Sequence, residues 1–199
     1  VERDFNHPSL IGWCPFNETW DWNHRKQCDT VLDAVYRATK AIDPTRPVID
    51  TSGSFHVVTD IYDVHDYEQD PNKFKEYYSK ISEGIVNDET ERNPIYRGRQ
   101  KYDGVLPFFI SEYGGIKWSS DSENSWGYGN APQTEDKFIQ RYKGLTEVIL
   151  NHKDIMGFCY TQLYDVEQEQ NGLMTYDRKF KFDPEIFRKI NTQTAAIEK

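Results

Sequence analysis

The sequence contains no long apolar run and no block rich in lysine or arginine. No stretch approaches the about 18 apolar residues that a membrane-spanning helix needs. The N-terminal segment VERDFNHPSL lacks the charged-then-apolar layout of a signal peptide. The 24 Lys and Arg residues are outnumbered by 33 Asp and Glu, so the formal net charge is −9. Because binding to phosphate backbones depends on clustered positive charge, the sequence argues against a membrane or a nucleic acid as partner.

Cysteine is scarce, and no metal site or cofactor is expected. The three cysteines are Cys14, Cys28 and Cys159. Their odd number, wide spacing and lack of a CxxC pair indicate neither a zinc site nor a disulfide framework, so we expect small buried apolar side chains. A second candidate for a metal is the acidic group Asp165, Glu167 and Glu169. It lacks the glycine and the ligand order of a calcium loop, which favours a solvated or substrate-contacting loop.

Aromatic residues, in contrast, are abundant. The chain has 13 Tyr, 11 Phe and 5 Trp among its 199 residues, many of them beside Gly, Asn, Asp or Gln. Such a composition is typical of sugar-binding surfaces and equally of ordinary aromatic cores. With 37% hydrophobic residues, the chain can form one well-packed domain or a small pair of domains.

The apolar pattern predicts alternating strands and helices. The five expected strands are IGWCPF (11–16), PVIDT (47–51), IYDVH (61–65), PFFIS (107–111) and IMGFCYT (155–161), whose near-continuous apolar character is typical of strands covered on both faces. Expected helices run from Cys28 to Ile42, from Pro71, after Thr134, and from Asp183-Pro184. This alternation predicts an α/β fold with a parallel sheet and helical crossovers.

Polar residues gather where the predicted strands end. The clusters are Asn17-Glu18, Thr51-Ser52, His65-Asp66-Tyr67, Glu112-Tyr113-Gly114-Gly115, and Gln162 with Asp165. Ligands of such sheets bind at the carboxyl ends of the strands, so these clusters predict an active site. Two polar stretches without a clear period, roughly 82–104 and 117–133, are expected to be loops over the same face, although the first can also form a small hairpin.

Glu18 and Glu112 form the candidate catalytic pair, because each directly follows an apolar strand. Glycosidic bonds are commonly cleaved by two carboxyl groups, one a general acid and the other a nucleophile or base. Trp13, Phe16 and Trp20 can supply the apolar surround that an acid needs. The rival interpretation is structural, since acidic residues at strand ends are also common as helix caps and loop anchors.

Three motifs resemble glycoside hydrolase family 2. VERDFNHPSLIGWCPFNE resembles the segment before and through the fourth barrel strand, which typically reads R-D-x-N-H-P-S and ends in Asn-Glu. PFFISEYGG resembles the seventh strand, which ends in the nucleophile. GFCYTQLYDVEQEQNGLMTYDRKFKFD is similar to the eighth strand and following loop of a β-galactosidase-like subgroup. The matches lie in the right order over nearly the whole chain.

The resemblance implies a (β/α)8 TIM barrel and retaining hydrolysis of β-glycosides, usually from the non-reducing end. Only strands four to eight map onto residues 1–199, so the chain is expected to be the C-terminal portion of the catalytic barrel, with strands one to three absent. An open sheet exposes unpaired edges. We therefore expect self-association, visible in size-exclusion chromatography as an apparent mass above 23.5 kDa.

The resemblance also implies roles for individual residues. Glu18 is the expected general acid/base and Glu112 the nucleophile, while Asn17 is expected to bond the 2-hydroxyl of the sugar. His65-Asp66-Tyr67 resembles the H-x-Y that follows the sixth strand in related barrels, which implies that Tyr67 orients and ionises Glu112. Asn17 can instead satisfy backbone groups at the strand end, and His65 can be a half-buried packing residue.

The remaining candidates concern the sugar. Trp118 and Trp126, in the loop after Glu112, can stack on a sugar ring or pin their loop to the body. Tyr160 and Gln162 occupy a region where many family members place a tryptophan under the sugar, so the sugar itself is left open. The main hypothesis is a β-galactosidase-like exo-β-glycosidase fragment, and the alternative is a carbohydrate-binding fragment that is catalytically incomplete. A domain serving only as an interaction surface leaves the three motifs unexplained.

Overall fold

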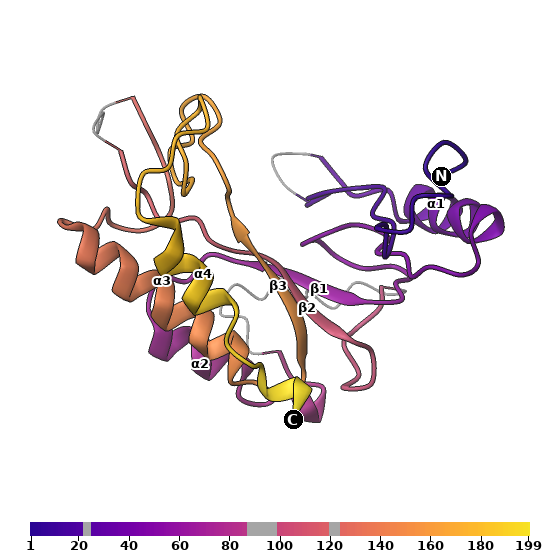
Figure 1. Cartoon of the computed structure of the whole chain (residues 1–199). Coiled ribbons are helices and arrows are strands. Elements are labelled where there is room, and N and C mark those ends of the chain that lie inside the picture. Colours follow the sequence, from indigo (N-terminus) through magenta and orange to yellow (C-terminus); the bar gives the residue numbers. More distant parts are fainter. Residues whose placement is uncertain (22–24, 87–98, 120–123) are drawn as a thin grey trace. The chain divides into compact units, whose positions relative to one another are not determined.

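The structure is a computed structural model of residues 1–199, and it describes residues 1–21, 25–86, 99–119 and 124–199. The strands are β1 (Tyr62–Asp66), β2 (Phe108–Gly114) and β3 (Ile155–Thr161). The helices are α1 (Asp29–Ile42), α2 (Pro71–Tyr78), α3 (Glu135–Leu150) and α4 (Pro184–Asn191), with short 3-10 turns at Ile81–Glu83 and Ala196–Glu198. Strands and helices alternate along the chain (Figure 1), so the predicted α/β class is confirmed.

The sheet is open and parallel, with three strands in the order β1-β2-β3. This arrangement is part of a barrel. The predicted strands 11–16 and 47–51 are wrong as sheet strands, since the two segments pair at the isolated parallel bridge Trp13–Val48 and the residues just after them at a second one, Asn17–Ser52. The physical reason is that a strand needs a continuous ladder of hydrogen bonds along its length, whereas these segments pair at separate points.

The chain divides into two compact units, and both β1 and β2 pass from one unit into the other. The first unit comprises Val1–His65 and Lys80–Phe109. Its core contains the packed rings of Tyr62, Tyr102 and Phe108. Asp43, at the end of α1, accepts hydrogen bonds from Trp13 Nε1 (2.8 Å) and Arg46 (2.7 Å). These bonds tie the N-terminal segment to the helix end.

The second unit comprises Asp66–Ser79 and Ile110–Lys199. In it α3 packs against α2, α4 and β3. Its core is strongly aromatic, with buried rings contributed by Phe74, Tyr78, Tyr113, Phe138, Tyr142, Phe182 and Phe187. Burying one such side chain stabilises the fold by about 1.5–3 kcal/mol. The aromatic abundance of the sequence therefore serves a core in large part.

Helix starts agree with the sequence. Thr134 caps α3 by accepting a hydrogen bond from the Lys137 N–H, and Asp183 caps α4 in the same way. The side-chain oxygen of such a residue satisfies an N–H that the first helical turn leaves unpaired. Among the described residues, no helix is long and apolar enough to cross a membrane.

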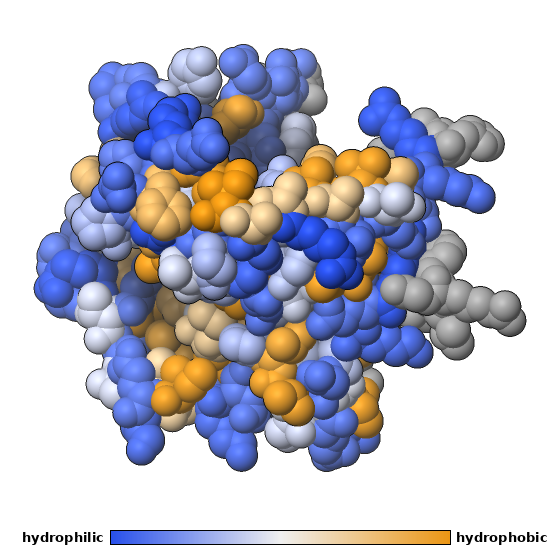
Figure 2. Space-filling model, turned by 90° about the vertical axis from the view of Figure 1, so that its right-hand side faces the viewer, coloured by the Kyte–Doolittle hydropathy of each residue, from blue (hydrophilic) through white to orange (hydrophobic). Residues whose placement is uncertain are grey.

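The expectation of buried cysteines is wrong, because Cys14, Cys28 and Cys159 are all exposed. Side chains alternate between the two faces of an extended segment. Cys14 lies in a segment that pairs only at isolated bridges, Cys159 lies in β3, and Cys28 is the N-cap residue of α1. On the face shown in Figure 2, apolar residues lie in several separate groups among hydrophilic ones. Self-association through uncovered surface stays a prediction.

Candidate active site

One group of candidate residues, called the Glu18 cluster, lies in the first unit and comprises Glu18, His65, Ser52 and Asp63. Glu18 donates its backbone N–H to the Ser52 carbonyl at 3.0 Å. It adopts a left-handed conformation, with φ 50°, which costs a non-glycine residue about 1–3 kcal/mol and is concentrated at functional sites. Its side chain is 40% exposed, and Oε1 lies 2.7 Å from Nδ1 of the buried His65.

The rest of the cluster fixes the orientation of the His65 ring. Ser52 donates its hydroxyl proton to Asp63 Oδ2 at 2.7 Å, and its oxygen lies 2.9 Å from His65 Nε2. Because the serine proton is committed to Asp63, Nε2 must be the donor in the second contact. The short contact between Nδ1 and Glu18 then also needs a proton, carried by either the ring or the carboxyl group. His65 is buried rather than half-buried, and both of its ring nitrogens have partners, Ser52 and Glu18.

Gly53 is required at its position beside this ring. It has φ 65°, and an added Cβ would lie 2.1 Å from the His65 ring. The Gly53 N–H also donates to Asp63 Oδ2 at 3.0 Å. A larger residue would displace His65 from Glu18.

Asp63 also forms a buried ion pair with His56. His56 is fully buried, with Nδ1 2.7 Å from Asp50 Oδ1 and Nε2 3.2 Å from Asp63 Oδ1. Burial by itself lowers the pKa of His56, but its hydrogen bonds with Asp50 and Asp63 outweigh this and raise the pKa to about 10. The imidazolium thus holds the carboxylate that orients Ser52.

We expect the free energy of unfolding to fall as the pH rises toward 10. Because the pKa of His56 is raised in the folded state, protonation of His56 stabilises the fold fully below about pH 6.5. This contribution is lost as the pH passes about 10. Urea unfolding across this range measures the free energy of unfolding. His56→Gln should cost about 3 kcal/mol at pH 6, because it leaves two buried carboxyl groups without their cation, and should flatten the pH dependence. His7→Gln, at a side chain that is 64% exposed, is the matched control. Equal pH dependence in both variants would contradict the assignment.

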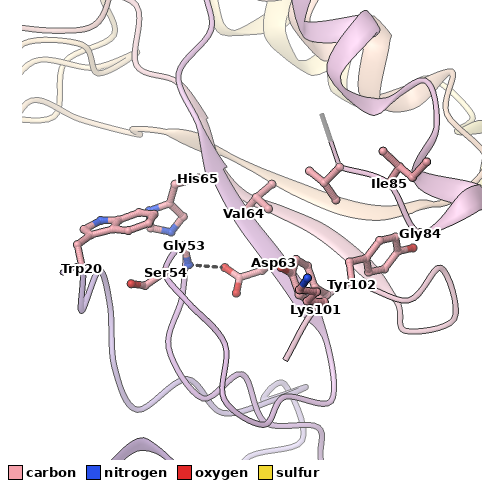
Figure 3. Close-up of a pocket in the computed structure, with 12 residues that line it drawn as sticks. Trp20, Gly53, Ser54, Asp63, Val64, His65, Gly84, Ile85, Lys101 and Tyr102 are labelled. Carbon is pink, nitrogen blue, oxygen red and sulfur yellow. Dashed lines mark hydrogen bonds between the residues drawn. The ribbon is translucent and has the colours of Figure 1, made fainter. Parts of the chain in front are cut away.

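A cavity of about 260 Å³ adjoins the Glu18 cluster within the same unit. Trp20, Tyr62 and Tyr102 supply its aromatic wall, and its polar lining includes His65, Asp63, Ser54 and Lys101. Figure 3 shows Trp20 beside His65, and the bond from Gly53 to Asp63 lies next to them. A cavity of this composition suits the apolar face of a sugar or an aromatic group.

Another group of candidate residues, called the Glu112 cluster, lies in the second unit and comprises Glu112, Tyr67 and Tyr128. Strand β2 carries Glu112, and Tyr67 follows β1 and donates its hydroxyl proton to Glu112 Oε2. Burial, together with the hydrogen bond to Glu112, raises the pKa of Tyr67 far above its usual range. The hydroxyl therefore stays a donor to this carboxylate at any ordinary pH.

Three other site residues predicted from sequence, Asn17, Trp126 and Trp118, differ in their exposure and contacts. Asn17 is exposed beside Glu18, with its backbone bridged to Ser52. Trp126 is 47% exposed and meets the ring of Tyr128 edge-on, with centroids 5.9 Å apart. Trp118, in contrast, packs against the core rings of Phe138 and Phe182, so the structure gives it the loop-pinning role.

Tyr160 and Gln162 belong to a network that holds two loops. The Tyr160 hydroxyl accepts from the Ile116 N–H at 3.1 Å and donates to the Asn171 carbonyl at 3.3 Å. Gln162 Nε2 donates to Asn171 Oδ1 at 3.0 Å. Tyr160 thus links the segment after β2 to Asn171, and Gln162 bonds to the same residue.

The acidic group after β3 is predicted to be a solvated or substrate-contacting loop, and Asp165 departs from the solvated form. Asp165 is buried and lies 2.7 Å from Lys181 Nζ, and Glu169 accepts a hydrogen bond from Asn171 at 3.0 Å. Asp165 loses its solvation because Lys181 folds over the loop and compensates its charge. Glu167 remains exposed.

Sequence reasoning missed three participants. The sequence marks Ser52 only as a polar residue after a predicted strand. Asp63 lies within an apolar segment, where nothing in the sequence indicates a role in the site. Tyr128 lies in a stretch without periodicity, so no local signal connects it with Tyr67. Only contacts between distant segments reveal these residues.

Residues 1–194 match the model of the family described as glycosyl hydrolases family 2, TIM barrel domain. No curated protein matches the chain.

Solved structures share the fold at low identity. A GH2 β-galacturonidase from Eisenbergiella tayi bound to galacturonate is 16% identical with a TM-score of 0.65, over 97% of this chain and 35% of that one. A Lactobacillus rhamnosus β-glucuronidase is 18% identical with a TM-score of 0.64, over 98% and 34%. A Bifidobacterium dentium β-glucuronidase is 17% identical with a TM-score of 0.63, over 96% and 32%. This chain spans about a third of the length of each structure. With its family match and this fold, the chain belongs to glycosyl hydrolase family 2 and carries part of its TIM barrel domain.

Proposed function

We propose that this chain carries the catalytic pair of a retaining β-glycosidase, with Glu112 as nucleophile and Glu18 as general acid/base. The observation that carries the proposal is that each glutamate has a dedicated partner suited to its role. Tyr67 donates a permanently available proton to Glu112, which favours a carboxylate poised to attack. His65 shares a proton position with Glu18, which favours a group that gives and takes protons.

The reaction follows from these roles in two displacements. Glu112 attacks the anomeric carbon while Glu18 gives its proton to the departing oxygen, so a glycosyl-enzyme ester forms and the leaving group is released as an alcohol. Glu18, now ionised, takes a proton from water, whose oxygen attacks the anomeric carbon and releases Glu112. Asn17, which is exposed beside Glu18, is proposed to bond the 2-hydroxyl of the sugar, a contact that strengthens in the transition state.

The sugar is proposed to be a terminal β-galactoside, on the strength of the resemblance of the segment around the eighth strand to a β-galactosidase-like subgroup. A β-uronide is the second candidate, because the similar structures include proteins named β-glucuronidase and β-galacturonidase. The full-length protein should be assayed with matched chromogenic β-galactoside, β-glucuronide and β-galacturonide. A selective preference for either uronide would replace the galactoside assignment.

The retaining mechanism has its own test. Proton NMR of the first product formed should show the β-anomer before mutarotation. Release of the α-anomer would contradict a double displacement. If the protein binds galactose with no turnover of any substrate in the panel, it is the carbohydrate-binding, catalytically incomplete alternative.

A further inference from the structure

The ring of Tyr67 is held by a residue from a distant loop. Tyr128 stacks on it with ring centroids 3.5 Å apart and an interplanar angle of 2°. The rings are almost parallel and in full contact. The stack restricts rotation of the Tyr67 ring, whose hydroxyl donates to Glu112.

Tyr128 is itself anchored to the end of β2, which carries Glu112. Its backbone N–H donates to the Gly115 carbonyl at 2.8 Å. A Cβ added to Gly115 would lie 2.4 Å from the Tyr128 ring and 3.1 Å from the Tyr67 ring. The backbone of Gly115 therefore fits closely against both rings. The Tyr128 ring and Glu112 are thus anchored to the same strand end.

A second contact fixes the backbone of Tyr67 to the same strand end. Gln69 Nε2 donates to the Tyr67 carbonyl at 2.9 Å and to the Gly114 carbonyl at 2.5 Å. Gln69 Oε1 in turn accepts from Arg141 at 3.3 Å. Both the backbone and the ring of Tyr67 are thus tied to the segment that follows Glu112.

We infer that Tyr128 is a positioning residue of the glycosidase: it fixes the plane of the Tyr67 ring so that the hydroxyl meets the Glu112 carboxylate in the reactive orientation. The inference rests on the proposed function and adds a residue to it. Preorganised donors cost no reorganisation during the reaction, and a misplacement of about 1 Å can cost about 100-fold in rate. A tyrosine that follows the end of a strand needs such support, because the strand's own ladder no longer restrains it.

The test is a double-mutant cycle in the full-length protein. Tyr128→Leu removes the stacking ring, and Tyr67→Phe removes the hydroxyl that the ring positions. With Tyr67 present, Tyr128→Leu should lower kcat/KM about tenfold or more, mainly through kcat. In the Tyr67→Phe background the same change should cost less than about twofold, because the two residues act as one unit. Tyr128→Phe, which keeps the ring, should recover most of the loss.

Controls separate this role from a structural one. Tyr176→Leu makes the same change at a tyrosine that is 62% exposed and should leave kcat/KM unchanged. If Tyr128→Leu does not fold, Gln69→Met removes the other restraint on Tyr67 and should show the same coupling. Equal losses in the two backgrounds, or no loss with Tyr67 present, would overturn the inference alone. A wild-type protein that neither turns over nor is labelled by a glycoside would remove the proposed function, and the inference with it.

Discussion

Glu112→Gln is expected to abolish formation of a covalent intermediate with a 2-fluoro glycoside and to lower kcat by about five orders of magnitude. The amide cannot attack the anomeric carbon, so the first displacement has no nucleophile. The Tyr67 hydroxyl, which donates to this side chain, can still donate to the amide oxygen. The local structure should therefore survive, and the loss should be one of chemistry.

Intact-protein mass spectrometry measures this result directly, because the trapped sugar adds its mass to the chain. Peptide mapping should place the added mass on the peptide that contains Glu112. Glu2→Gln, the same change at an exposed residue, is the matched control and should label normally. Normal labelling of the Glu112→Gln variant would remove Glu112 as nucleophile.

Glu18→Ala is expected to slow substrates with poor leaving groups by about 100- to 10,000-fold and to affect activated aryl glycosides much less. The acid's task is to protonate the departing oxygen, and an aryl oxygen that is already a good leaving group does not need that proton. Azide should restore part of the rate, because it can attack the glycosyl-enzyme without a general base and fits the space that the lost carboxyl group leaves.

The decisive measurement is the dependence of kcat/KM on the pKa of the leaving group. It should be steep in Glu18→Ala and shallow in the wild type, and the azide reaction should yield a β-glycosyl azide. Glu83→Gln, at another exposed glutamate of the first unit, should keep the wild-type slope. Equal slowing of all substrates would assign Glu18 another role, such as anchoring His65.

Local features of the sequence predicted the helices well. The cap at Thr134 and the starts at Pro71 and Asp183-Pro184 are confirmed, because capping depends on hydrogen bonds between residues close in sequence. Strands were harder to predict. The apolar segments 11–16 and 47–51 have the composition of strands but pair only at isolated bridges, since pairing depends on which partner lies alongside.

The exposure of a side chain was likewise predicted wrongly from sequence where it depends on residues far away along the chain. Cys14 and Cys159 are exposed although they lie in apolar segments. Asp165 is buried although it lies in an acidic stretch, because Lys181 compensates its charge. In each case, the exposure of the side chain depends on whether a segment from elsewhere in the chain packs over it.

By itself the sequence determined the α/β class, the family through three motifs, and the two candidate glutamates, because these depend on residue types and their order. The family resemblance already named Tyr67 as the partner of Glu112, whereas only the tertiary structure gave Glu18 its partner His65. Glu18 meets His65 across 47 residues of sequence, and Tyr67 meets Glu112 across 45. Asp63 and Tyr128, which help to hold those partners, carry no local signal, and the sequence marks Ser52 only as a member of a polar cluster. Hydrogen bonds and ring stacking act over a few ångströms in space, and only the folded backbone brings such distant segments within that range.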